Sequence, residues 1–91
     1  MEEKTTKLSE KTQNTHRAIE SLREEIEAVD FYNQRADACT DEELKKILIH
    51  NADEEKEHFA MLLEWIRRQD SQLEKELKET LFKNGPITGQ H

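Results

Sequence analysis

Two long segments of this chain carry a repeat of mostly apolar positions, which are spaced in alternating steps of four and three residues. The repeat in the first segment consists of Ala18, Leu22, Glu25, Val29, Tyr32, Ala36 and Cys39. The repeat in the second consists of Leu44, Leu48, Asn51, Glu55, His58, Leu62, Trp65 and Gln69. A spacing of about 3.5 residues keeps one stripe of a helix facing a partner helix. The pattern therefore predicts two long α-helices that pack along these stripes.

Capping signals divide the helical part of the chain. A polar stretch over residues 1–7 precedes the first helix, which we expect over residues 8–39. A Thr-x-x-Glu capping box at residues 40–43 begins a second helix, which we expect to run from Asp41 to about Gln69. A Ser-x-x-Glu signal at residues 71–74 predicts a short third helix that ends near Phe82. Because the turn between the long helices is very short, they should form an antiparallel hairpin.

The domain organisation follows from length and composition. We expect a disordered N-terminus over residues 1–7, one helical hairpin domain over residues 8–83 and a flexible tail over residues 84–91. The chain has 91 residues, of which only two are Gly and one is Pro, so the fold class should be all-α. Charged residues make up 38% and hydrophobic residues 33%, which leaves little apolar surface for the core of a lone monomer.

A second apolar stripe on the later helix indicates an oligomer. It consists of Ile47, Phe59, Leu63 and Ile66. A hairpin of two helices cannot cover two stripes of the same helix by itself. We therefore expect a partner chain, so that two hairpins form a four-helix bundle.

Charge and apolar content narrow the function classes. The net charge of −7 argues against nucleic acid, whose binding proteins carry basic faces, and suits a protein that attracts cations. No apolar run approaches the roughly 20 residues that a membrane span needs, and the N-terminus has no apolar stretch typical of a signal peptide. Cys39 is the one cysteine and cannot form a disulfide within the chain. We expect a cytoplasmic protein.

The polar residues at the centre of the two stripes predict a metal site. Glu25 lies between Leu22 and Val29 in the first stripe, and Glu55 and His58 form a Glu-x-x-His step in the second. Residues three apart share one helix face, and carboxylate with imidazole suits iron, manganese or zinc. Buried carboxylates are costly unless they are paired or bound to a cation. Two hairpins would supply the six side chains of a di-iron carboxylate bundle.

Other interpretations of these residues stay open. Glu25, Glu55 and His58 could be solvated residues on a charge-rich helix. The protein would then be a non-enzymatic helical assembly module, whose central polar residues fix the register of packing. A third interpretation keeps the metal but makes it structural zinc or manganese in an oligomer. His50 and Cys39 are interpreted as surface and packing residues.

Three blocks of the sequence resemble the encapsulated ferritins, which are iron-oxidising proteins of bacteria and archaea housed inside encapsulin shells. The blocks are residues 22–32 (Leu-Arg-Glu-Glu-Ile-Glu-Ala-Val-Asp-Phe-Tyr), residues 51–58 (Asn-Ala-Asp-Glu-Glu-Lys-Glu-His) and residues 63–68 (Leu-Glu-Trp-Ile-Arg-Arg). The resemblance extends over about residues 8–86. Together the blocks are far more specific than a Glu-x-x-His step alone.

The resemblance implies a ferroxidase that oxidises Fe(II) to Fe(III) for iron storage inside an encapsulin nanocompartment of the cytoplasm. It implies a ferritin-like two-helix subunit with a short C-terminal helix, assembled as a homodecameric ring of five dimers. Each dimer interface would hold two iron ions, with Glu25, Glu55 and His58 of each chain as catalytic metal ligands. Glu55 would bridge the ions. The implied partners are further copies of the chain and the encapsulin shell protein.

The resemblance also assigns residues around the centre. Tyr32 matches a tyrosine beside the iron ions, which could hydrogen-bond a ligand. Glu24 and Glu27 match carboxylates on the route by which iron approaches. Two features depart from the family: Phe31 stands where a Trp is common, and residues 87–91 do not form the apolar and basic docking peptide that usually follows a flexible linker.

Overall fold

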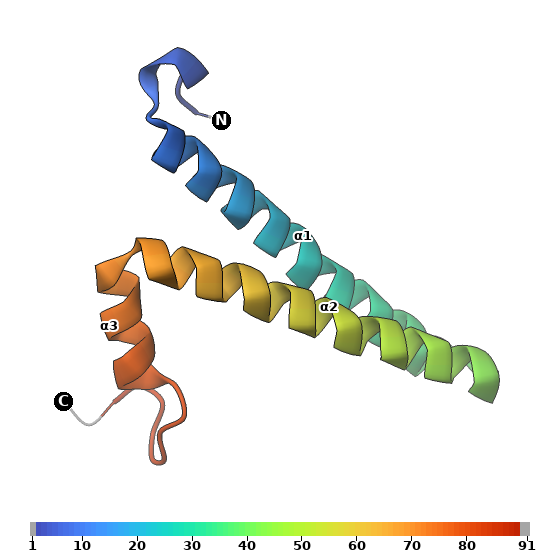
Figure 1. The fold of residues 1–91 in the computed structure, drawn as a ribbon. Helices are drawn as coiled ribbons and strands as arrows, with labels where there is room; N and C mark the ends of the chain where they lie inside the picture. The colour runs from blue at the N-terminus through green and yellow to red at the C-terminus, as the bar shows by residue number, and fades with distance from the viewer. Residues whose placement is uncertain (1, 90–91) are drawn as a thin grey trace.

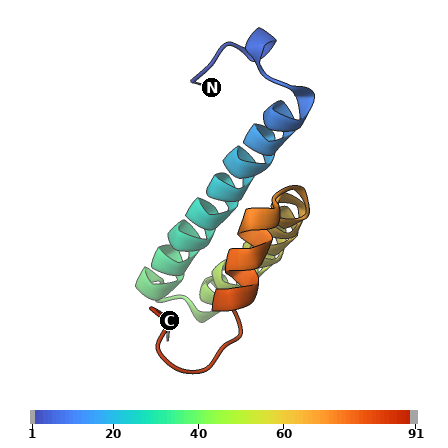
Figure 2. The same ribbon diagram turned by 90° about the vertical axis from the view of Figure 1, so that its left-hand side faces the viewer.

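A computed structural model describes residues 2–89 of the chain, and that part of the molecule is all-helical. The helices are η1 (Thr5–Lys7, a 3₁₀ turn), α1 (Glu10–Ala38), α2 (Glu42–Gln69) and α3 (Ser71–Thr80). The two long helices lie side by side as an antiparallel hairpin, and α3 turns sharply away from the end of α2 (Figures 1 and 2). The predicted all-α class is confirmed, whereas the pairing of two chains stays a prediction.

The predicted boundaries of the helices hold to within about two residues, but two of the caps differ. Ser9 caps α1 by accepting a hydrogen bond from the backbone N–H of Thr12 at 3.1 Å. Asp41, and not Thr40, caps α2, because its Oδ1 accepts from the N–H of Leu44 at 2.8 Å. Such a side-chain acceptor satisfies one of the free N–H groups in the first turn.

The cap of α3 also differs from the prediction by one residue. Asp70, and not Ser71, accepts a hydrogen bond, from the N–H of Leu73 at 3.0 Å. The helix ends at Thr80, two residues before the predicted end near Phe82, and its C-cap is Leu81. The predicted disorder of residues 1–7 and the predicted flexibility of residues 84–91 stay predictions, and residues 1, 90 and 91 lie outside the described part of the chain.

Ion pairs join α2 to α3. Arg67 donates to Glu64 within α2 at 2.5 Å and to Glu74 of α3 at 2.7 Å, and Arg68 also donates to Glu64 at 2.8 Å. The hydrogen bond from Arg67 and, to a smaller extent, the one from Arg68 lower the pKa of Glu64 to about 2. The hydrogen bond to Glu64 likewise raises the pKa of Arg67. No residue of α3 is buried, and the Arg67–Glu74 ion pair joins it to α2.

The core between α1 and α2 is small. Its buried hydrophobic residues are Ala18, Val29, Ala36, Ala52 and Ile66. The three on α1 belong to the predicted stripe, but Ala52 and Ile66 lie one position beyond the predicted Asn51 and Trp65 on α2. A shift of one residue rotates a position by about 100° around a helix, so Trp65 is left 38% exposed.

Much apolar surface therefore remains outside the core of a single chain. The exposed large hydrophobic residues are Ile19, Ile26, Phe31, Leu44, Ile47, Ile49, Met61, Trp65, Leu81, Phe82 and Ile87. Among the described residues, no helix is long and apolar enough to cross a membrane. Exposed apolar surface on this scale marks interaction sites. Of the stripe predicted to need a partner chain, however, only Ile47 is among these exposed residues, and Ile66 is buried within the single chain.

Candidate metal centre

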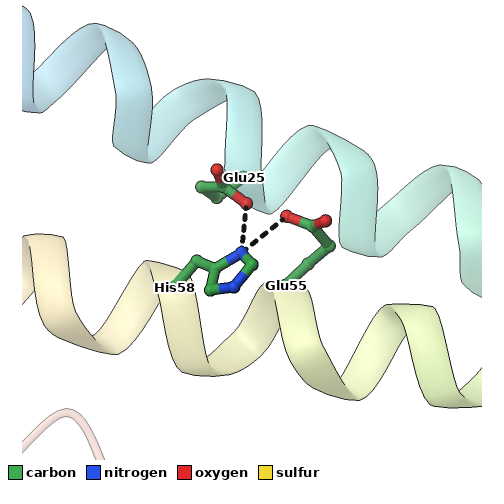
Figure 3. A group of neighbouring side chains, drawn as sticks. All are labelled: Glu25, Glu55 and His58. Atoms are coloured by element: carbon green, nitrogen blue, oxygen red, sulfur yellow. Dashed lines mark ion pairs between the residues drawn. The ribbon is translucent and has the colours of Figure 1, made fainter.

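The hairpin brings Glu25 of α1 together with Glu55 and His58 of α2, near the middle of both helices (Figure 3). Each residue offers one ligand atom, and these atoms all lie within 4.8 Å of one another. The Nδ1 atom of His58 lies 3.4 Å from Oε2 of Glu25 and 3.4 Å from Oε2 of Glu55. In residues 2–89 this is the one group of three or more such side chains placed to hold a metal ion.

Local packing explains why the three side chains meet. Glu55 and His58 are three residues apart on α2 and so point to one side of that helix. Ala52, one turn earlier, is only 1% exposed, and its small side chain lets the two helices approach closely at this level. On α1, the buried Val29 follows Glu25 by four residues, which turns the Glu25 carboxylate toward the same seam.

The electrostatics of the group favour a cation. Oε2 of Glu25 is buried and has no hydrogen-bond partner, because its 3.4 Å approach to His58 does not have hydrogen-bond geometry. A buried acceptor without a partner costs free energy, and a second carboxylate beside it adds repulsion. A metal ion between the three ligand atoms would relieve both costs.

The donor set fits iron, manganese or zinc. Two carboxylates and one imidazole are hard and borderline donors that suit these ions. The side chains of Glu25 and Glu55 are 26% and 24% exposed, and that of His58 is 44% exposed, so the group lies at an open edge of the hairpin. Three protein ligands leave further coordination positions free for other groups. Nε2 of His58 points away from both carboxylates (Figure 3) and could bind an orienting partner.

The other predicted site residues lie outside this group. Tyr32 is half-buried, and its ring lies under the guanidinium of Arg35, with Cζ 5.5 Å from the ring centroid. Arg35 also lies 5.9 Å from the centroid of Phe31. Glu24 and Glu27 are exposed and do not join the metal-binding group. The roles in the approach of iron that the resemblance implies for Glu24 and Glu27 stay predictions.

Two features of the site were not predicted from the sequence. Arg35 contacts both aromatic rings because it follows them by four and three residues, a spacing that could have indicated the contact. Ala52 lies between polar neighbours and carries no signal of its importance to packing. His50, interpreted as a surface residue, lies with Nε2 2.7 Å from Glu54 Oε1 at an exposed position.

A helical hairpin with a carboxylate and histidine group at its centre places the chain among the ferritin-like proteins. Residues 1–84 match the model of the EncFtn-like family, and the chain belongs to that family. The resemblance to encapsulated ferritins indicated by the sequence blocks is thereby confirmed.

Individual relatives agree with this assignment. The chain is 60% identical over 81 residues to the "Encapsulated ferritin-like protein" of Rhodospirillum rubrum. The aligned region covers 89% of the chain and 58% of that relative. It is 49% identical over 86 residues to the "Ferritin-like protein" of Thermotoga maritima, covering 94% of the chain and 75% of the relative. The chain thus spans little more than half the length of the first of these relatives.

A third relative and a solved structure extend the comparison. The "Encapsulin nanocompartment cargo protein EncC" of Myxococcus xanthus is 37% identical over 68 residues, or 75% of the chain and 52% of that protein. The crystal structure of protein ne0167 from Nitrosomonas europaea superimposes with a TM-score of 0.94 at 64% identity, and 98% of each chain is covered. The fold of the hairpin and its third helix is therefore shared with a solved protein of almost equal length.

Proposed function

We propose that this protein is a ferroxidase that oxidises Fe(II) to Fe(III) at a di-iron centre formed between two copies of the chain. The observation that carries the proposal is the meeting of Glu25 with Glu55 and His58 around a buried carboxylate oxygen that has no hydrogen-bond partner. Iron is the substrate of this reaction. The membership of the chain in a ferritin-like family supports iron over manganese or zinc.

A second copy is needed because one chain supplies only half of the ligand set. A di-iron centre of this type uses four carboxylates and two imidazoles, and one hairpin offers two carboxylates and one imidazole. The group lies at an open edge, where His58 is accessible and exposed apolar residues continue along α2 in both directions. We propose that two hairpins close over this edge and place four carboxylates and two imidazoles around two iron ions.

The side chains have distinct roles in the proposed reaction. The carboxylates of Glu25 and Glu55 stabilise Fe(III) more than Fe(II), because hard oxygen donors prefer the more highly charged ion. Glu55 of each chain would bridge the two ions. Nδ1 of His58 in each chain would bind one of the two ions. Tyr32 would hydrogen-bond a ligand, and its ring is held in place by Arg35. The oxidant, O2 or peroxide, takes up the electrons.

Further assembly is proposed from the remaining surface and from the relatives. Ile19 and Ile26 are exposed one heptad apart on α1 and offer a second surface, through which dimers could join into a ring of ten chains. Two of the relatives are named as encapsulated or as encapsulin cargo. We propose by analogy that this protein also works inside an encapsulin shell in the cytoplasm, where the shell would store the mineral that an open ring cannot retain. Exposed Glu24 and Glu27 would attract Fe(II) on its way to the centre.

Iron oxidation by purified protein tests the proposal. Fe(II) is added without oxygen, oxygen is then admitted, and the growth of Fe(III) absorbance is compared with that in buffer alone. The wild-type chain should oxidise iron quickly, whereas Glu55→Ala and His58→Ala should fall to the rate in buffer. Glu57→Ala is the matched control, since Glu57 is an exposed neighbour outside the metal-binding group.

Native mass and metal content, measured with and without Fe(II), complete the test. Two iron ions per pair of chains are expected in the assembled protein. A metal that raises thermal stability while iron shows no turnover would instead indicate a structural zinc or manganese site. The absence of any effect of metals would leave only an assembly module.

A further inference from the structure

Arg35 differs from the other arginines of the chain in what its guanidinium contacts. The other four each donate to a carboxylate or amide oxygen, and they are Arg17, Arg23, Arg67 and Arg68. The Cζ atom of Arg35 lies instead 5.9 Å from the ring centroid of Phe31 and 5.5 Å from that of Tyr32. Within residues 2–89, Arg35 makes no ion pair and no side-chain hydrogen bond, although 21 of the 91 residues of the chain are acidic.

The sequence around Arg35 explains this difference. A residue on a helix meets the side chains three and four positions away. For Arg35 these are Phe31, Tyr32, Ala38 and Cys39, none of which is acidic. A guanidinium within about 6 Å of a ring centroid is attracted by the negative charge of the ring face. The positive charge of Arg35 therefore acts on the two rings and is not neutralised by a carboxylate.

Tyr32 is the ring of this pair that can take part in redox chemistry. It is half-buried and is the only tyrosine of the chain. It follows Glu25 by seven residues, or about two turns, so both side chains leave α1 on the same side. A phenol beside iron and its oxidant is open to a side reaction. Two phenols each give one electron and one proton to a molecule of hydrogen peroxide, which yields two phenoxyl radicals and two water molecules. The loss of the O–H would leave Tyr32 unable to donate a hydrogen bond.

We infer that Arg35 is a positioning residue that protects Tyr32 from one-electron oxidation. The inference rests on the proposed function, because it takes Tyr32 to lie beside the iron ions. The electrons of the ring attract the guanidinium, so the removal of one of them weakens the attraction and makes oxidation less favourable. Phe31 contacts the same guanidinium and helps to keep the exposed Arg35 over Tyr32.

Oxidation of Tyr32 in the absence of iron tests the inference. Protein kept metal-free by a chelator is oxidised with photochemically generated ruthenium(III) tris-bipyridine, and electron paramagnetic resonance measures the phenoxyl radical. The signal reports Tyr32 alone, and Tyr32→Phe supplies the background. Arg35→Met keeps a long side chain beside the rings but removes the charge. Its radical should form about two- to fivefold faster than that of wild type, a factor that corresponds to the strength of an exposed cation–π contact.

Three further variants separate the charge of Arg35 from its shape and from the net charge of the protein. Arg35→Lys keeps the charge and should return the rate toward that of wild type. Arg35→Gln should behave as Arg35→Met does, and it carries the test if Arg35→Met does not fold. Arg23→Met removes one positive charge elsewhere on α1, where Arg23 pairs with Glu20, and should leave the rate unchanged. Circular dichroism checks that each variant is helical.

Iron turnover supplies a second measurement. Fe(II) and hydrogen peroxide are added repeatedly, and mass spectrometry measures the oxidised fraction of the peptide that contains Tyr32. This fraction should grow faster in Arg35→Met than in wild type, Arg35→Lys and Arg23→Met. Equal growth in all four proteins, while wild type oxidises iron, would overturn the inference.

The outcomes of the iron-free assay separate the inference from the proposed function. A wild-type rate of radical formation in both Arg35→Met and Arg35→Gln overturns the inference. A rate in Arg35→Lys as high as that in Arg35→Met also overturns it, since Arg35 would then act by shape alone. An equal increase in Arg23→Met does so too, because net charge would explain it. If Arg35→Met is oxidised faster but wild-type protein oxidises no iron, the effect of Arg35 on Tyr32 stands and the ferroxidase proposal fails.

Discussion

Replacement of Glu25 by Gln should stabilise the metal-free protein and weaken its response to metal. The substitution keeps the shape of the side chain and removes one of two carboxylate charges whose ligand atoms lie within 4.8 Å. Two unit charges at 4.8 Å, the upper bound of this separation, repel by about 1 kcal/mol in water and by about 3.5 kcal/mol at an effective dielectric constant of 20. The side chains of Glu25 and Glu55 are 26% and 24% exposed, which places the site between these limits. We expect Glu25→Gln to gain about 1–3 kcal/mol in the free energy of unfolding.

Urea unfolding followed by circular dichroism measures this change. Protein concentration must be held fixed, because association makes apparent stability depend on concentration. With a chelator present, Glu25→Gln should be more stable than wild type. With Zn²⁺ at one hundred times its dissociation constant, wild type should gain about 2.7 kcal/mol, whereas the variant should gain much less. Glu24→Gln removes the same charge from an exposed neighbour and should change neither measurement appreciably.

Two results would refute the reasoning. If Glu25→Gln were less stable than wild type with the chelator, the Glu25 carboxylate would already be satisfied in the metal-free protein. If both proteins gained equally from Zn²⁺, Glu25 would not be a metal ligand.

Three further substitutions probe the cap, the core and the α3 junction. Asp41→Ala should lower the free energy of unfolding by about 1 kcal/mol in urea titrations, because the N–H of Leu44 loses its cap. Ala52→Leu should cost about 1–3 kcal/mol by overpacking the hairpin, and metal titrations should show weaker binding as the helices separate. Glu64→Gln should lower the melting temperature at pH 7. Because the folded pKa of Glu64, about 2, lies below its ordinary value of 4.5, this contribution is complete above pH 4.5, and melting curves should show the difference from wild type vanish as pH falls toward 2.

The helices could be predicted closely from the sequence because their signals are local. The first helix was expected over residues 8–39 and spans Glu10–Ala38, and the second was expected from Asp41 and spans Glu42–Gln69. The repeat of apolar positions predicted the two long helices, and the polar residues suited to capping predicted their ends to within two residues. The caps themselves were misplaced by one residue because Asp competes with a neighbouring Thr or Ser for the same position.

The packing face of α2 could not be predicted with the same success. A strict repeat of 3.5 residues placed Asn51 and Trp65 in the seam with α1, but Ala52 and Ile66 are buried there instead. A stripe of large apolar residues shows that a face is covered, yet it does not show which neighbour covers it. The small Ala52 marks close approach of two helices, and nothing in its polar sequence surroundings distinguishes it from an exposed alanine. The three predicted ligand side chains still come together, because Glu55 and His58 lie at the edge between the two faces.

This division of α2 into two faces links the stability of the protein to its proposed chemistry. One face, with Ala52 and Ile66, fixes α2 against α1 and so brings Glu55 and His58 to Glu25 within a single chain. The other, with Ile47 and Trp65, remains exposed in the single chain. Metal and second copy would act on the same carboxylates, so each should strengthen the binding of the other by the same free energy. A chain that buried both faces within itself would hold its three ligands equally well, but it would leave no surface through which a second set could reach the ions.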